Sequence, residues 1–152
     1  MNGVLLDTSG YVHLMKGHSG ISEAAGKADR VVLSSVVVGE LLWAFRGGRH
    51  RKRNEDYLAR FLAREDVDQV PVDGVTADRY ALIKDSVHEA GTPVPVNDLW
   101  IAATAMQHGL RVVTTDSDFL RIPQIRVDHF ETPGGRPLLR PRAPGGSRKR
   151  GR

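Results

Sequence analysis

Short runs of aliphatic residues alternate with longer stretches of helical periodicity over residues 1–131. The aliphatic runs predict strands at residues 4–6, 31–33, 67–72, 112–113 and 125–127. The stretches between them predict helices at residues 9–16, 21–27, 35–45, 55–64, 76–90 and 98–108. Strands and helices interleaved in this way connect through right-handed crossovers. We therefore expect an α/β fold with a parallel sheet of about five strands and helices on both faces.

The distribution of charge divides the chain into two parts. The formal net charge is +4, with 22 Lys and Arg against 18 Asp and Glu. Residues 132–152 hold seven of these basic residues and no acid, which leaves residues 1–131 with 15 basic and 18 acidic residues. We expect residues 1–131 to form one domain and the Pro-, Gly- and Arg-rich residues 132–152 to be a disordered tail. Such a tail is either a segment that binds polyanions such as RNA or a solvated end.

The composition excludes several classes of protein. The chain has no cysteine, so it cannot hold a disulfide, a thiol nucleophile, a zinc–thiolate site or an iron–sulfur cluster. No stretch reaches the roughly 18 consecutive apolar residues that a membrane helix needs. Asp7 also interrupts the apolar start where a signal peptide would continue. We therefore expect a soluble cytoplasmic protein.

Three aspartates are expected at one edge of the predicted sheet. Asp7 follows the first strand, Asp116 follows the strand at residues 112–113, and Asp98 opens the helix at residues 98–108. In a parallel sheet, the carboxyl ends of the strands and the amino ends of the following helices share the edge where ligands bind. A turn or the helix dipole accounts for each aspartate alone. Three at one edge favour a binding site.

Glu40 lies on an apolar face of the helix predicted at residues 35–45. The residues one turn away on either side are Val36, Val37, Trp43 and Ala44. No Lys or Arg is therefore in reach to form an ion pair within the helix. A carboxylate in apolar surroundings needs a partner from elsewhere in the fold. At an edge with three other acids, we expect that partner to be a metal ion.

Four carboxylates in one site cannot all stay ionised without compensation, because like charges at short range raise at least one pKa. A divalent cation removes the conflict, and a ligand set made of oxygen atoms favours Mg²⁺ or Mn²⁺ over zinc. Such an ion supports the hydrolysis of phosphodiester bonds. We expect Asp7 and Asp98 to be the principal ligands, with Glu40 and Asp116 binding a second ion or orienting water.

Several neighbouring polar residues are candidates for hydrogen bonds to these carboxylates. They are Thr8, Ser9, Asn97, Thr115 and Asp118. Thr115 is the one that we favour. Asn97 is expected to cap its helix, and Asp118 to cap a loop rather than to bind the ion.

Four segments around the acids resemble a known family. They are VLLDTSG with Asp7, SSVVVGELLWAF with Glu40, PVNDLWIAATA with Asp98, and VVTTDSDF with Asp116. In this order and spacing, residues 1–130 resemble the PIN-domain ribonucleases of the VapC toxin type. The resemblance implies a three-layer sandwich and a homodimer whose paired acidic sites cleave RNA with Mg²⁺ or Mn²⁺. It also implies a small VapB-type antitoxin that docks on an apolar groove and places a basic side chain near the acids.

A basic cluster follows the helix of Glu40. In RGGRHRKR, two glycines are expected to end the helix and to leave a loop with five basic residues: Arg46, Arg49, Arg51, Lys52 and Arg53. A site of four carboxylates repels phosphates, so we expect this basic patch to bind RNA. The alternative is a solvated linker. The two tryptophans, Trp43 and Trp100, are expected in the core.

Two other functions are compatible with parts of the sequence. A phosphotransferase that forms an aspartyl phosphate would also place an Asp after the first strand, but Ser9 occupies the position where a second Asp is usual. A non-catalytic module that binds RNA would account for the basic tail but gives no reason for Glu40. A metal-dependent endoribonuclease accounts for all four acids.

Overall fold

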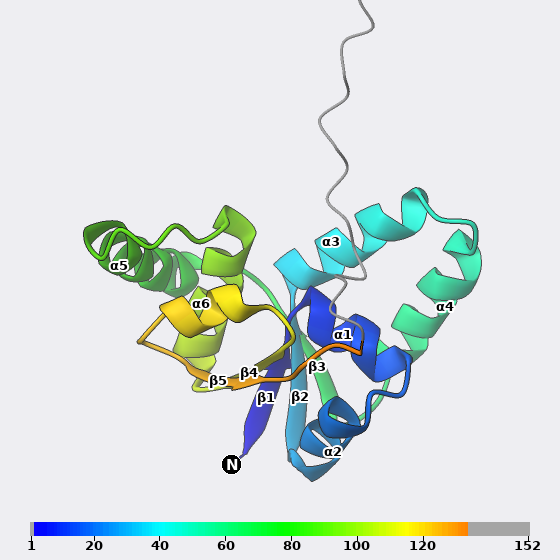
Figure 1. Cartoon of the computed structure of the whole chain (residues 1–152). Coiled ribbons are helices and arrows are strands. Elements are labelled where there is room, and N and C mark those ends of the chain that lie inside the picture. Colours follow the sequence, from blue (N-terminus) through cyan, green and yellow to red (C-terminus); the bar gives the residue numbers. More distant parts are fainter. Residues whose placement is uncertain (1, 134–152) are drawn as a thin grey trace, which may run out of the picture.

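The computed structural model describes residues 2–133, which form a five-stranded sheet with helices around it (Figure 1). The strands are β1 (Gly3–Leu6), β2 (Arg30–Ser34), β3 (Val67–Val70), β4 (Arg111–Thr114) and β5 (Arg126–His129). The helices are α1 (Thr8–Met15), α2 (Ser19–Lys27), α3 (Ser35–Arg46), α4 (Arg51–Leu62), α5 (Gly74–Glu89), α6 (Val96–His108) and the short 3-10 helix η1 (Ser117–Arg121). The α/β prediction is confirmed. Apart from its first two residues, the predicted tail lies outside the described residues.

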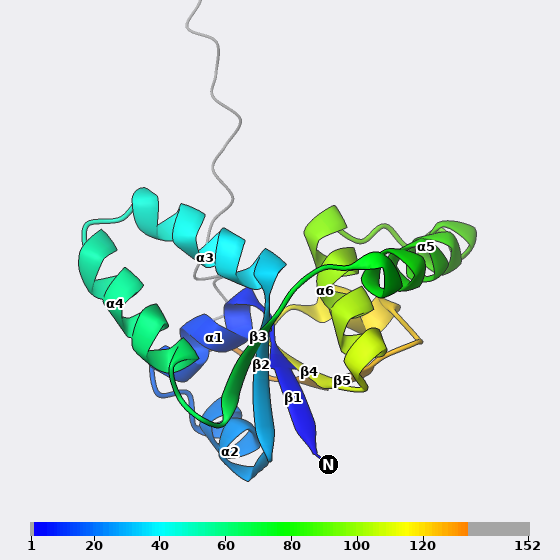
Figure 2. The ribbon, with the colours of Figure 1, turned by 180° about the vertical axis from the view of Figure 1, so that it is seen from behind.

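The order of the strands creates a reversal in the middle of the sheet. The order is β3-β2-β1-β4-β5, and every neighbouring pair is parallel. The chain runs from β1 outward to β3 and then returns to β4 on the other side of β1. Right-handed connections therefore place α1 to α4 on one face and α5 and α6 on the other, and Figures 1 and 2 show these two groups on opposite sides of the strands. Ligands bind beyond the carboxyl ends of strands at such a reversal, here β1 and β4.

Aliphatic strands and apolar helix faces form the core. Leu5, Leu6, Val112 and Val113 in the central strands are fully buried, as expected for a sheet covered on both faces. The core fixes β1 and β4 side by side, in a register that pairs Leu6 with Val113. The residues that follow these two positions are therefore brought together at the edge.

The ends of α6 follow from local sequence. The helix begins after Pro95 and ends at Gly109, whose φ of 64° is the left-handed conformation that glycine adopts without strain. Asn97 was expected to cap this helix, and that prediction is wrong. Asn97 lies within the first turn, and no side chain in the described part of the chain caps α6.

Two further predictions differ from the structure. Trp43 is 58% exposed, because it lies on the side of α3 away from the buried residues Val37, Val38 and Leu41. Trp100 is half-buried and stacks on Tyr80, with ring centroids 4.0 Å apart. The basic cluster is also less of a loop than expected, because Arg51 already begins α4. Among residues 2–133, none of the helices has both the length and the apolar character that crossing a membrane requires.

Candidate active site

The carboxylate of Asp7 is held rigidly at the end of β1. It is only 4% exposed and serves as the N-cap of α1, accepting a 2.7 Å hydrogen bond from the backbone N–H of Gly10. The hydroxyl of Ser9 donates to both carboxylate oxygens at 2.8 and 3.0 Å. The hydroxyl of Thr114 donates at 2.7 Å. Asp7 is thus both a helix cap and the centre of a hydrogen-bond network that joins β1 to β4.

Thr114 is the residue that sequence reasoning missed. It is the last residue of β4, and its hydroxyl reaches Asp7 while also accepting a 2.9 Å hydrogen bond from the backbone N–H of Asp116. Thr115, favoured from sequence for this role, instead donates its backbone N–H to the hydroxyl of Ser9 at 3.0 Å. Successive side chains along a strand point to opposite faces of the sheet, so only one of two neighbouring threonines can face the carboxylate of Asp7. The register that decides between them is visible in the fold and not in the sequence.

Glu40 reaches the same edge from α3. Ser34 caps this helix by accepting from the backbone N–H of Val37 at 3.2 Å, which sets the start of α3 at the end of β2. Glu40 lies in the second turn and accepts a 2.9 Å hydrogen bond from the hydroxyl of Thr8. The partner that this half-buried carboxylate needs within the fold is therefore the hydroxyl of Thr8, the first residue of α1.

Asp98, Asp116 and Asp118 form the tightest group of acids. One carboxylate oxygen of each lies within 4.8 Å of the others. Asp98 comes from the first turn of α6, and the two other residues come from the segment after β4. The expectation that Asp118 caps a loop is wrong. Asp116 is the cap of η1, accepting from the backbone N–H of Asp118 at 2.9 Å, and the side chain of Asp118 joins the acidic group.

Burial and mutual repulsion raise the pKa values in this cluster. Burial raises the pKa of Asp7 to about 6, although hydrogen bonds from Thr114, Gly10 and Ser9 oppose the shift. The pKa of Asp98 is raised to about 8, first by burial and then by the negative charges of its neighbours. These neighbours are, in order of effect, Asp116, Asp7, Glu40 and Asp118. The four acids predicted from sequence and Asp118 therefore share one electrostatic environment.

This group of acids has the chemistry of a site for a hard divalent cation. The close group consists of carboxylate oxygens alone, which favour Mg²⁺ or Mn²⁺. Without a cation, Asp98 ionises only at raised pH, which is the electrostatic conflict that a bound cation removes. Asp98, Asp116 and Asp118 are the residues placed to share such an ion. Asp7 has its oxygens occupied by hydrogen bonds from the protein.

The basic patch lies away from the acids, at the far end of α3 and the start of α4 (Figure 2). All five of its members, Arg46, Arg49, Arg51, Lys52 and Arg53, are exposed. Arg46 follows Glu40 by six positions in α3, a rise of about 9 Å along a helix. Arg51 is paired with Glu55 at 2.7 Å, so it contributes less free charge than the others.

An apolar groove lies beside this patch, between α1, α3 and α4. It has a volume of about 520 Å³, and its apolar lining includes Tyr11, Met15, Leu41, Phe45 and Tyr57. Lys16 and Arg53 also line it. Met15 and Tyr57 are 46% and 47% exposed. Apolar surface of this kind at a groove marks a site of interaction with another molecule.

Known proteins match this chain in both sequence and structure. Residues 4–125 match the PIN domain family. Ribonuclease VapC5 of Mycobacterium tuberculosis is 33% identical over 115 residues, which cover 76% of this chain and 84% of that protein. Ribonuclease VapC4 of the same organism is 28% identical over 95 residues, 62% of this chain and 73% of that protein.

The fold is similar to solved structures of toxin–antitoxin complexes. A chain of DNA-bound VapBC from Salmonella typhimurium superposes with a TM-score of 0.75 and 28% identity, covering 85% of this chain and 98% of that one. VapBC-5 from Mycobacterium tuberculosis gives a TM-score of 0.67 at 28% identity, covering 86% of this chain and 100% of that one. The chain therefore belongs to the PIN-domain family, as a ribonuclease of the VapC type.

Proposed function

We propose that this protein is an endoribonuclease toxin that depends on Mg²⁺ or Mn²⁺ and uses Asp7, Glu40, Asp98 and Asp116 as its catalytic acids. The observation that carries the proposal is the site of Asp98. Its carboxyl group lies within 4.8 Å of those of Asp116 and Asp118, and its pKa is raised to about 8. Such a group is suited to release its proton and bind a divalent cation.

The residues of the site have distinct tasks under this proposal. When bound, Mg²⁺ or Mn²⁺ supplies the positive charge that activates water and stabilises charge on the phosphodiester in hydrolysis. Asp98, Asp116 and Asp118 hold the ion. Asp7, fixed by its hydrogen bonds, orients the end of β1 and adds negative charge, which departs from the principal ligand role expected from sequence. Glu40, held by Thr8, is placed on the opposite helix to orient water.

The structure disfavours the aspartyl-phosphate alternative. A carboxylate that attacks phosphorus needs a free and accessible oxygen. Asp7 is 4% exposed, and both of its oxygens accept hydrogen bonds from the protein. The alternative of a non-catalytic RNA-binding module leaves the raised pKa of Asp98 without a function.

We propose that the basic patch binds the RNA substrate at a distance from the acids. Its exposed cations lie at the far end of α3. RNA that follows this helix from its far end would reach Glu40 near its middle. Contacts of this kind are electrostatic and independent of base sequence. We place this activity in the cytoplasm, where cellular RNA is available.

We propose that a VapB-type antitoxin occupies the apolar groove between α1, α3 and α4. The groove combines aromatic side chains, Tyr11, Phe45 and Tyr57, with the two cations Lys16 and Arg53. An amphipathic segment with an apolar face and acidic ends matches this composition. The solved structures that the chain resembles are themselves VapBC complexes, which supports a partner of this class.

We also infer that the toxin forms a homodimer. Apolar side chains on α5 and α6, namely Val75, Leu82 and Val96, are 48%, 45% and 53% exposed. They offer apolar surface on the side of the molecule opposite to the groove helices (Figure 2). Light scattering during size-exclusion chromatography would show twice the mass of the chain if the inference holds.

Cleavage of labelled structured RNA by the purified protein tests the proposed function. We expect cuts with Mg²⁺ and with Mn²⁺, none with EDTA, and none for Asp98→Asn or Glu40→Gln. Asp85→Asn, which neutralises an exposed acid on α5, serves as the matched control and should cut like the unaltered protein. The proposal fails if the unaltered protein cuts nothing with either ion, or if Asp98→Asn cuts as well as it does.

A further inference from the structure

The close acids reach the site from two different segments of the chain. Asp98 follows the segment of residues 91–95 that connects α5 to α6. Asp116 and Asp118 lie at the start of η1. The distance between the carboxylates of Asp98 and Asp118 therefore depends on how these two segments are held together.

Arg121 connects the two segments directly. Its Nη1 donates a 2.8 Å hydrogen bond to the backbone carbonyl of Pro93, just ahead of α6. The same Nη1 lies 3.4 Å from a carboxylate oxygen of Asp118. The backbone of Arg121 is fixed because both Phe119 and Ile122 beside it are almost fully buried. One guanidinium group thus contacts one of the acids and the segment that leads to another.

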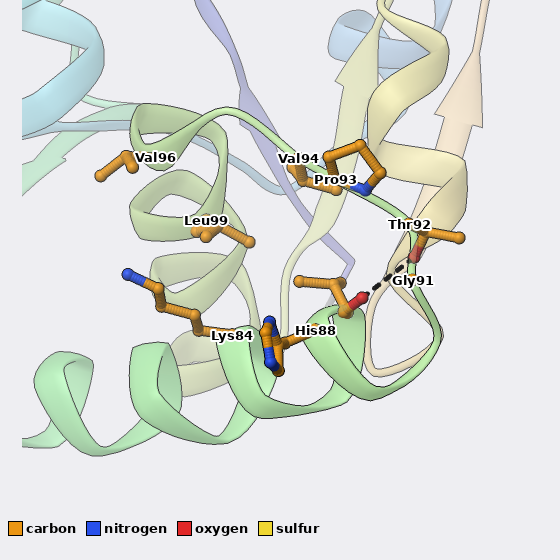
Figure 3. A pocket seen from close by; sticks show the side chains of 9 residues that line it. Lys84, His88, Gly91, Thr92, Pro93, Val94, Val96 and Leu99 are labelled. Carbon is orange, nitrogen blue, oxygen red and sulfur yellow. Dashed lines mark hydrogen bonds between the residues drawn. The ribbon is translucent and has the colours of Figure 1, made fainter.

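The segment that Arg121 holds packs Val94 against the core but has few polar contacts of its own. A cavity of about 420 Å³ lies between this segment and α5 and α6, and Figure 3 shows Pro93 and Val94 on one side of it and Lys84 and His88 on α5. The start of the segment is held by Thr92, whose backbone N–H and hydroxyl both donate to the carbonyl of Val87. Pro93 has no N–H to donate, so the contact with Arg121 is a main constraint on this stretch.

We propose that Arg121 is a positioning residue of the acidic site, which holds Asp118 and the start of α6 at the spacing that a divalent cation requires. The inference rests on the proposed function in that Asp98 and Asp118 bind the ion. Residues that orient metal ligands affect affinity strongly, typically about 10- to 100-fold. Its ion pair with Asp118 is half-exposed, and such pairs add little to the stability of the fold.

The direction in which the Mn²⁺ affinity changes when Arg121 is removed separates a positioning role from a purely electrostatic one. A positive charge beside the site repels a cation, so the loss of Arg121 through charge alone would tighten Mn²⁺ binding. A loss of positioning would weaken it. The two roles therefore predict opposite changes for Arg121→Ala.

Calorimetric titration of the full chain with Mn²⁺, without RNA, tests the inference. We expect Arg121→Ala to weaken Mn²⁺ binding about tenfold, with a melting temperature close to that of the unaltered protein. In the background of Asp118→Asn, Arg121→Ala should weaken Mn²⁺ binding much less. The effects of two substitutions are not additive when the residues act through one another. Arg126→Ala is the matched control, since Arg126 is an exposed arginine that also donates to a backbone carbonyl, that of Gly109.

Arg121→Lys covers the case in which the alanine variant does not fold. Lysine keeps the charge, but its ammonium group is one bond closer to the backbone than Nη1 and falls short of the contact with Pro93, so we expect weaker Mn²⁺ binding than in the unaltered protein. The inference is overturned if Arg121→Ala and Arg121→Lys bind Mn²⁺ as tightly as the unaltered protein, or if Arg126→Ala weakens binding equally. An unaltered protein that binds no Mn²⁺ would instead overturn the proposed function, and the inference with it.

Discussion

The hydroxyl of Thr114 donates a 2.7 Å hydrogen bond to the buried carboxylate of Asp7, 107 residues away in the sequence. The bond joins the ends of β1 and β4, the two strands at which the order of the sheet reverses. It also stabilises the ionised form of a carboxylate whose pKa burial raises to about 6. The stability of the fold and the charge of the site thus depend on the same contact.

Removal of this hydroxyl should destabilise the protein. Thr114→Val keeps the shape of the side chain and leaves a buried carboxylate with one donor fewer, which typically costs about 1 to 3 kcal/mol. Urea unfolding near neutral pH would measure the loss. Thr104→Val is the control, because the buried hydroxyl of Thr104 bonds only the carbonyl of Trp100 within α6. An equal loss in both variants would contradict the special role of Thr114.

The free energy of unfolding should depend on pH in an unusual direction when no metal is bound. Asp98 has a pKa of about 8 in the folded state against an ordinary value of 3.8. Between these values the folded state binds more protons than the unfolded state, so its stability falls as pH rises. Asp7 adds to the same trend between 3.8 and about 6.

Asp98→Asn isolates this contribution, because asparagine resembles the protonated acid. In EDTA, we expect the variant to melt near the temperature of the unaltered protein below pH 3.8, and increasingly above it as the pH rises toward 8. Melting curves across this range provide the measurement. A difference between the two proteins that does not grow with pH would mean that Asp98 ionises normally.

Metal binding should release a proton from the cluster. At pH 7 most of Asp98 is protonated, given its pKa of about 8, and a carboxylate must lose its proton to bind a cation. Titration calorimetry with Mg²⁺ in buffers of different ionisation enthalpy should show the release of up to about one proton per ion. For Asp98→Asn we expect almost none. Equal release in both would assign the proton to another group.

The contribution of the basic patch to RNA binding can be measured through salt. Each side chain that no longer binds a phosphate should reduce the slope of log affinity against log salt by about 0.7 to 0.9. Neutralising Arg46, Arg49 and Arg53 to glutamine should therefore reduce the slope by about 2 to 3. Single-stranded RNA and an inactive Asp98→Asn background allow binding to be measured without cleavage.

Three arginines elsewhere provide the control for this measurement. Arg64 and Arg126 are exposed and Arg79 is half-buried, and Arg64 and Arg79 form ion pairs with neighbouring aspartates. Their neutralisation should leave the slope nearly unchanged. If both triple variants reduce it alike, the protein binds RNA through its general charge and not through the patch.

The groove should depend on its exposed aromatic side chain. Tyr57 is 47% exposed and lines the groove, and aromatic residues of this kind often cost about 2 kcal/mol or more of binding energy when truncated. Tyr57→Ala should therefore weaken the binding of the antitoxin about 30-fold or more. Val72→Ala, at a similarly exposed position (40%) outside the groove and the proposed dimer surface, is the control and should have no effect. Surface-immobilised antitoxin would report both.

Sequence reasoning located the acids because they sit at the ends of recognisable elements. Asp7 and Asp116 follow aliphatic strands and Asp98 opens a helix, so the rule for parallel sheets was enough to bring them together. The choice between Thr114 and Thr115 required the register of β4 against β1, which depends on tertiary pairing.

The sequence predictions that failed share one physical cause. They rested on the local sequence pattern, whereas the outcome depended on how the elements pack and turn in the fold. Trp43 stands among apolar residues in the sequence, but it lies on the side of α3 opposite to Leu41 and Phe45, which pack against the core. The first turn of α4, Arg51–Arg53, is basic and lacks apolar periodicity, which made it indistinguishable from a loop. Asp118 joined the acidic group only through the turn of η1.

The bond between Asp7 and Thr114 joins an early and a late part of the chain, so the site is completed late in synthesis. Because Asp7 is made early and its partner strand late, a nascent chain lacks β4, Asp116 and the buried environment of the site until most of the protein has been translated. The groove helices α1, α3 and α4 are complete well before then. If the antitoxin binds the groove as proposed, the residues of its binding surface are synthesised before the nuclease site is complete.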